Sequence, residues 1–157
     1  MIRRTFLKVA AMGGSATLLS FRVAGAADDT EALLLSCMDY RLVESTERYM
    51  AQRGLRKKYD HIVLAGASLG AVTEKFPAWN KTFWEHLGVA VDLHHIQKVV
   101  VLNHRDCGAY KLVFSEDISK DRVRETAVHT TSLRELRKQI QARQPKLTVE
   151  LDRKSVV

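Results

Sequence analysis

The sequence predicts a single-domain α/β protein with a mostly parallel β-sheet flanked by helices. Three short apolar runs carry this prediction: Ala32–Leu35, Ile62–Leu64 and Val99–Leu102. Such runs, rich in branched aliphatic side chains, are typical of strands that are buried on both faces. Helical patterns separate the runs, and an alternation of strand and helix favours parallel pairing with right-handed crossovers.

The first 26 residues are expected to be a twin-arginine signal peptide. The arginine pair Arg3-Arg4 is followed by a modestly apolar region and then by the small-residue site Ala24-Gly25-Ala26. The apolar region is too short, and too interrupted by glycine, to form a stable membrane anchor. We therefore expect residues 27–157 to form the domain and the protein to be exported to the periplasm by the twin-arginine translocation machinery. The alternative is an N-terminal amphipathic helix that stays attached.

Much of the basic charge of the chain belongs to this leader. The whole chain has a net charge of +7. Residues 1–26 include four basic residues and no acidic residue, so the net charge of the remainder is +3. The chain contains no long block of like charge of the kind that binds nucleic acid, so we expect no nucleic-acid partner.

The remaining elements follow from helical and alternating patterns. The pattern from Leu42 to Gln52 predicts a helix that stops near Gly54. We expect further helices over 80–95 and 109–114, and a longer one that is capped by Ser119 or Asp121 and reaches Arg143, with His129 on its surface. The alternation over 147–151 indicates an edge strand.

His104 and Cys107 come directly after the apolar run Val99–Leu102. In an open α/β sheet, ligands bind at the carboxyl ends of the strands. An imidazole and a thiolate are both favoured zinc ligands. Gly108 would let the backbone approach closely or turn sharply behind the thiolate. The pair alone is weak evidence for a metal site, because a buried free cysteine beside a loop histidine is the more common arrangement.

The only other cysteine strengthens the case for a metal. Cys37 also follows an apolar run, so Cys37, His104 and Cys107 converge if the two strands are parallel neighbours. Three protein ligands with one open position are typical of a catalytic zinc. A Cys37–Cys107 disulfide is the competing interpretation in an exported protein. A disulfide, however, would leave Asp39, Arg41 and His104 without a purpose.

These residues resemble the β-class carbonic anhydrases, which carry Cys-x-Asp-x-Arg after the first strand and His-x-x-Cys-Gly after a later one. Cys37-Met38-Asp39-Tyr40-Arg41 and His104-Arg105-Asp106-Cys107-Gly108 match both patterns. Ala65-Gly66-Ala67-Ser68 looks like the Ala-Gly-Asn turn of the family, with Ser68 in place of the asparagine. The resemblance covers about half of the chain, from Leu33 to Leu112.

The resemblance implies one zinc ion per chain and the reversible hydration of carbon dioxide to bicarbonate by a zinc-bound hydroxide. Asp39 would orient the hydroxide, and Arg41 would pair with Asp39. In a second, inactive state of the family this pair breaks and the aspartate binds the zinc. Gly66, Ala67, Ser68 and Gly108 are the candidate substrate-binding residues, because a small, glycine-rich turn such as 65–70 can present backbone N–H groups to an anionic substrate. The alternative for that turn is a tight turn with no ligand.

Two other functions stay open at this point. One is a zinc hydrolase of a related small substrate, carbonyl sulfide or carbon disulfide. The other is a non-catalytic exported protein that binds metal or carries a disulfide. A homodimer or larger assembly is also expected, with Trp79, Phe83 and Trp84 as anchors unless they are core residues.

Overall fold

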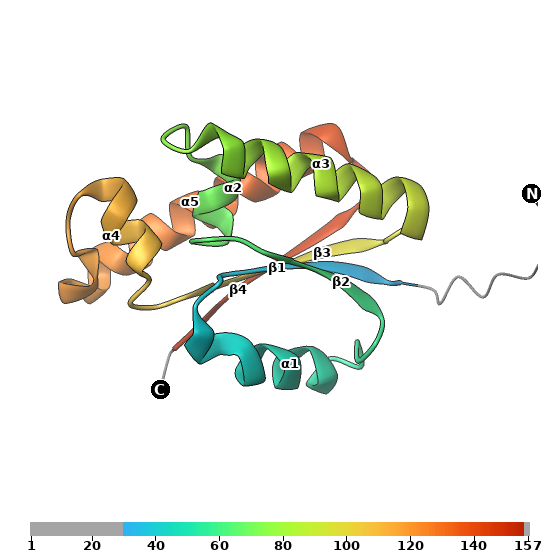
Figure 1. Cartoon of the computed structure of the whole chain (residues 1–157), viewed down its shortest axis with the longest axis horizontal. Coiled ribbons are helices and arrows are strands. Elements are labelled where there is room, and N and C mark those ends of the chain that lie inside the picture. The colour runs from blue at the N-terminus through green and yellow to red at the C-terminus, as the bar shows by residue number, and fades with distance from the viewer. Residues whose placement is uncertain (1–29, 156–157) are drawn as a thin grey trace, which may run out of the picture.

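A computed structural model describes residues 30–155 of the chain. Its centre is a four-stranded sheet in the order β2-β1-β3-β4, and every neighbouring pair is parallel (Figure 1). The strands are β1 (Ala32–Ser36), β2 (Tyr59–Val63), β3 (Lys98–His104) and β4 (Thr148–Lys154). The predicted fold class, a mostly parallel sheet flanked by helices, is confirmed.

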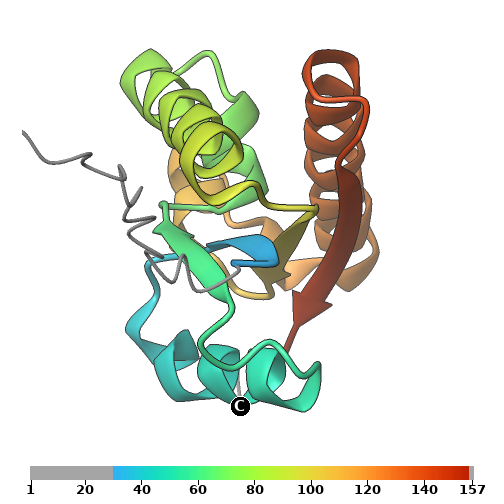
Figure 2. The same ribbon diagram turned by 90° about the vertical axis from the view of Figure 1, so that its right-hand side faces the viewer.

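Helices cover both faces of the sheet. Figure 2 shows α1 on one face and α3 and α5 on the other. The α-helices are α1 (Val43–Gln52), α2 (Ser68–Val72), α3 (Pro77–His94), α4 (Gly108–Phe114) and α5 (Arg122–Arg143), and two 3-10 helices, η1 and η2, span Tyr40–Leu42 and Ile118–Lys120.

The strand order explains this arrangement and creates a crevice. The chain moves from β1 outward to β2 and then returns past β1 to form β3 on the other side. With right-handed crossovers, reversing the direction of travel places the next helices on the opposite face. The carboxyl ends of β1 and β3 therefore form the point at which the strand order reverses, where open α/β sheets bind their ligands.

Alternating side chains of the central strands fill two separate cores. Leu33 and Leu35 of β1 pack with Val99 and Val101 in the core beneath α2, α3 and α5. The intervening Leu34 packs with residues of α1 in the second core. Because both faces of these strands are covered, every residue of β1 is buried, as the continuous apolar runs predict.

The boundaries of several elements differ from the prediction. Strand β3 continues through Asn103 and His104, so the predicted polar turn begins two residues later than expected. Helix α3 begins at Pro77 and not at Asn80, because a proline at the first helical position has no intrahelical N–H bond to lose. The short helix α2 was not predicted, and of the two proposed caps Asp121 is the one that accepts from the first turn of α5.

Two side chains lie deeper than the sequence suggested. His129 was expected on the surface of its helix, but it is only 1% exposed because that side of α5 faces α4 and the end of β3. Phe83 is fully buried in the core and is therefore unavailable as an interface anchor. Trp84 is partly buried and lies beneath the guanidinium group of Arg143.

The predicted signal peptide, residues 1–26, lies outside the described residues. Within residues 30–155, no helix has the length and apolar character needed to cross a membrane.

Candidate metal centre

Three buried side chains converge at the switch point of the sheet. Cys37 directly follows β1, His104 is the last residue of β3, and Cys107 precedes α4. Their ligand atoms all lie within 4.8 Å of one another, and the two sulfur atoms are 3.8 Å apart. This distance is far longer than a disulfide bond, so the two cysteines are free thiols. The two cysteines and the histidine therefore converge, as predicted.

The imidazole of His104 is oriented for metal binding. Its Nδ1 lies 2.8 Å from the carbonyl oxygen of Arg105, and because a carbonyl only accepts, Nδ1 carries the proton. The opposite nitrogen, Nε2, is therefore an acceptor, and it is buried without a hydrogen-bond partner among the described residues. A buried lone pair beside two thiols fits a metal ion, because metal-binding histidines donate their other N–H to a backbone or carboxylate oxygen.

The two thiols differ in acidity because they share one proton. The hydrogen bond from Cys107 lowers the pKa of Cys37, with further stabilisation of its thiolate from His104 and the Gly66 N–H. The hydrogen bond to Cys37, together with burial, raises the pKa of Cys107. Burial works to lower the pKa of His104, but the neighbouring Cys37 thiolate raises it overall. A cation that replaces the shared proton would stabilise such a donor set.

Asp39 and Arg41 form a bidentate ion pair beside the two cysteines and the histidine. Arg41 Nε donates to Asp39 Oδ1 at 2.8 Å, and Arg41 Nη2 donates to Asp39 Oδ2 at 2.6 Å. These hydrogen bonds lower the pKa of Asp39 to about 2. The Oδ2 atom is 3.8 Å from Nε2 of His104, so the carboxylate lies against the candidate metal position.

The small-residue turn before α2 contributes a backbone donor. Gly66 N–H donates to the sulfur of Cys37 over 3.4 Å. Gly66 has a φ of +76°, which favours glycine, and a Cβ there would lie a tight 3.1 Å from the Cβ of Ala109. Ala67 also has a positive φ, +47°, and is fully buried.

Ser68 is the first residue of α2, and Gly108 is the first residue of α4. Ser68 is fully buried, and its hydroxyl hydrogen-bonds to Asn103, Tyr110 and Ser132 inside the protein. A Cβ at Gly108 would meet nothing within 4 Å, so no close backbone approach occurs there. The sharp turn instead falls on Asp106, which has a φ of +55°.

Asn103 is a site residue that sequence reasoning missed. Its Oδ1 accepts from the Ser68 N–H at 3.2 Å, and its Nδ2 donates to the hydroxyls of Ser68 and Tyr110. The amide of Asn103 thereby contacts Ser68, the position at which the resemblance led us to expect an asparagine. The available signal was an asparagine that interrupts an apolar strand directly before His104.

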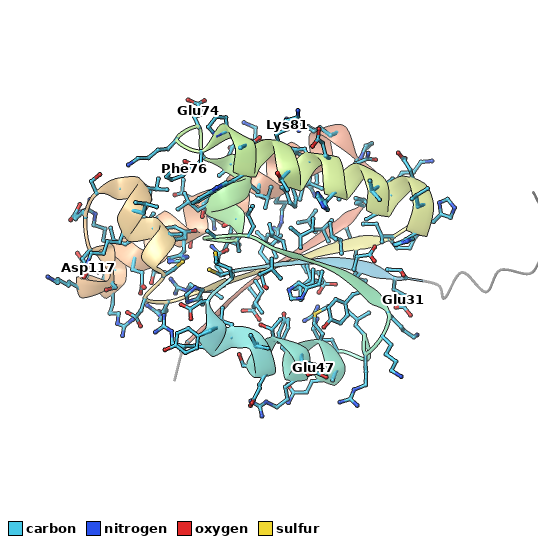
Figure 3. All side chains as sticks on the ribbon, viewed as in Figure 1. Glu31, Glu47, Glu74, Phe76, Lys81 and Asp117 are labelled. Atoms are coloured by element: carbon cyan, nitrogen blue, oxygen red, sulfur yellow. The ribbon has the colours of Figure 1, made fainter. Side chains whose placement is uncertain are left out.

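A groove of about 670 Å³ leads away from Cys37 and Asp39 between α1 and β2. Glu47 of α1, labelled in Figure 3, is one of its lining residues. The hydroxyl of Thr46 in its wall is buried and has no hydrogen-bond partner in the part of the chain that the structure describes. The groove also contains His61, whose Nε2 is 2.7 Å from the hydroxyl of Ser36. Of the three candidate metal ligands, Cys37 is the one that lines this groove.

The close contact between α2 and the turn before it depends on a glycine in the helix, whose replacement should destabilise the fold. A Cβ at Gly70 would lie 2.5 Å from the carbonyl oxygen of Ala65, which is backbone and cannot move away. We expect Gly70→Ala to lower the free energy of unfolding by about 1–3 kcal/mol in a denaturant titration. Gly88→Ala is the matched control, because a Cβ there meets nothing within 4 Å in α3. The control should raise stability by about 0.5–1 kcal/mol, and equal effects of the two substitutions would contradict the prediction.

The fold and the site define the class of this protein: a parallel α/β protein with a buried Cys₂His group at the switch point of its sheet. A family model described as "Putative carbonic anhydrase" matches residues 27–149. The chain belongs to this carbonic anhydrase-like family.

Two relatives are similar over 122 residues, 78% of this chain. One is an uncharacterized protein of Rickettsia bellii, 39% identical, of which the match covers 74%. The other is an uncharacterized protein of Rickettsia conorii, 36% identical, of which the match covers 66%.

Proposed function

We propose that this protein binds one zinc ion through Cys37, His104 and Cys107 and catalyses the reversible hydration of carbon dioxide to bicarbonate. The observation that carries the proposal is the buried, unpartnered Nε2 of His104, which lies beside two thiols in a member of this family. Two thiolates and an imidazole are a ligand set of catalytic zinc sites that keep an open position.

Zinc at this position would supply a hydroxide nucleophile near neutral pH, because it lowers the pKa of bound water. The protein would supply orientation. As a carboxylate, Asp39 can only accept hydrogen bonds, so it would accept the hydrogen of the nucleophile and turn an oxygen lone pair toward the carbon of the substrate. Arg41 holds both oxygens of Asp39, which fixes the carboxylate and keeps it ionised.

The direct test combines zinc analysis with a carbon dioxide hydration assay on residues 27–157. We expect about one equivalent of zinc per chain and a hydration rate well above that of the buffer. Carbonyl sulfide and carbon disulfide are assayed in parallel. Turnover of either one without carbon dioxide hydration would replace the proposed substrate. A zinc content below about a tenth of an equivalent, together with a Cys37–Cys107 disulfide, would overturn the metal assignment.

Hydration should rise with pH. The established pKa of the zinc-bound water in three-histidine carbonic anhydrases is about 7, and two charged thiolates should move the midpoint here to between about 7 and 9. Arg41 lowers the pKa of Asp39 to about 2, so Asp39 loses its charge only as the pH falls toward that value. Stopped-flow rates between pH 6 and 10 check this, and a rate that falls over this range would contradict it.

We also propose that the protein is exported through the twin-arginine route. The support is the arginine pair Arg3-Arg4 ahead of an apolar region and a small-residue cleavage site. Replacing both arginines with lysine should leave the uncleaved precursor inside the cell, as fractionation and immunoblotting would show. Normal export of that variant would indicate another route.

A further inference from the structure

We propose that Glu125 is a positioning residue for the loop that carries two of the three metal ligands. This inference rests on the proposed function only in that the loop holds a metal ion. Glu125 belongs to α5, eighteen residues beyond Cys107 in the sequence, and is only 1% exposed. Its two carboxylate oxygens face the residues between His104 and Cys107.

One oxygen of Glu125 holds the backbone of this loop. The Asp106 N–H donates to Glu125 Oε1 at 2.7 Å. Asp106 is the residue at which the loop turns sharply, with a φ of +55° that few side-chain-bearing residues adopt, although aspartate does so more often than most. A short, charge-assisted hydrogen bond at this point compensates for the unfavourable conformation.

The other oxygen is neutralised by arginines. Arg105 Nη1 donates to Glu125 Oε2 at 2.8 Å, and Arg122 Nη1 lies 3.3 Å from the same atom. Burial works to raise the pKa of Glu125, but the Asp106 N–H and these two guanidinium groups lower it overall. The carboxylate is therefore charged at neutral pH, and its hydrogen bond to the loop is of the strong, ionic kind.

The same loop residue also contacts the ion pair at the metal centre. The carbonyl oxygen of Asp106 accepts from Arg41 Nη2 at 3.3 Å, and Arg41 in turn holds Asp39. The backbone of Asp106 is thus held on both sides, by Glu125 at its N–H and by Arg41 at its carbonyl. Without Glu125, the spacing of His104 and Cys107 would no longer be fixed.

Three substitutions test this role through zinc affinity, measured by competition with a chelator. Glu125→Ala should raise the dissociation constant for Zn²⁺ by about 10- to 100-fold, the usual effect of losing a residue that orients metal ligands. Glu125→Gln keeps an acceptor for the Asp106 N–H and should stay within about threefold of the native value. Glu116→Gln, which removes an exposed carboxylate paired with Arg124, is the charge-matched control and should have no effect.

Thermal unfolding of the metal-free variants separates positioning from simple stabilisation. Both Glu125 variants lose the carboxylate that pairs with Arg105 and Arg122, so both should unfold at lower temperature, whereas only Glu125→Ala should lose zinc affinity. If Glu125→Ala does not fold, Glu125→Asp replaces it, because the shorter side chain keeps the charge but withdraws the acceptor.

The proposal is overturned if Glu125→Ala, or Glu125→Asp in its place, binds zinc within about twofold of the native protein. It is also overturned if Glu125→Gln loses as much affinity as Glu125→Ala, because the retained acceptor would then be irrelevant. A native protein that binds zinc but does not hydrate carbon dioxide would refute the proposed function and leave this test intact, since its readout is metal affinity.

Discussion

His104→Ala should give a folded protein that holds less than about a tenth of an equivalent of zinc and hydrates carbon dioxide no faster than the buffer. His104 supplies the only neutral ligand of the three candidates, and its Nε2 has no hydrogen-bond partner among residues 30–155. Without it, two thiolates remain, and they are 3.8 Å apart. Two ligands are fewer than the three that catalytic zinc sites take from the protein.

The matched control for this substitution is His86→Ala. His86 is exposed on α3, and its Nδ1 bonds only to the carbonyl of Thr82 in the same helix. Zinc content, hydration rate and the far-ultraviolet circular dichroism spectrum are measured for both variants. Native zinc content in His104→Ala would show that the metal binds elsewhere. If His104→Ala loses the native circular dichroism spectrum, Cys107→Ser is measured in its place.

Asp39→Asn and Arg41→Ala should both reduce hydration by about 100-fold or more, for different reasons. An amide at position 39 can donate a misplaced hydrogen bond where the carboxylate only accepts, so zinc should stay bound with its open position accessible. Removal of Arg41 instead releases Asp39, whose Oδ2 is already 3.8 Å from His104 Nε2. The freed carboxylate should then bind the zinc and close the open position.

X-ray absorption of the zinc-loaded variants distinguishes the two effects. Arg41→Ala should show four protein ligands, whereas Asp39→Asn should retain a solvent ligand. Two controls remove similar groups elsewhere: Arg56→Ala at the same groove, and Asp60→Asn, which pairs with His94. Native hydration rates in both test variants would show that the Asp39–Arg41 ion pair has only a structural role.

The central strands and the candidate metal ligands were predictable because both leave local signals. A strand buried on two faces must be a continuous apolar run, as Leu33–Leu35 and Val99–Leu102 are. Once two such runs are parallel neighbours, the residues that follow them must lie at the same edge. The convergence of Cys37 with Cys107 therefore follows from topology alone, without knowledge of any side-chain geometry.

The supporting residues were not predictable because their roles arise from distant parts of the chain. His129 lies on a long, charged helix, and nothing in its neighbourhood shows that this side of the helix packs over the metal loop. The carboxylate of Glu125 looks like one of many surface acids until the fold brings it to Asp106. Helix α2 is a single short turn of small residues, for which the helical pattern is too brief to detect.

The strand order also determines how the candidate metal ligands come together. The two sulfur atoms belong to residues 70 positions apart, and the direct pairing of β1 with β3 brings them close to each other. Closing a loop of that length carries an entropy cost of about 4 kcal/mol, which the apolar pairing of the two strands helps to offset. The affinity of the candidate site for a metal ion should therefore depend on how completely the β1–β3 ladder is closed. A substitution that leaves a cavity in that ladder, far from the candidate ligands, should weaken zinc binding before it unfolds the sheet.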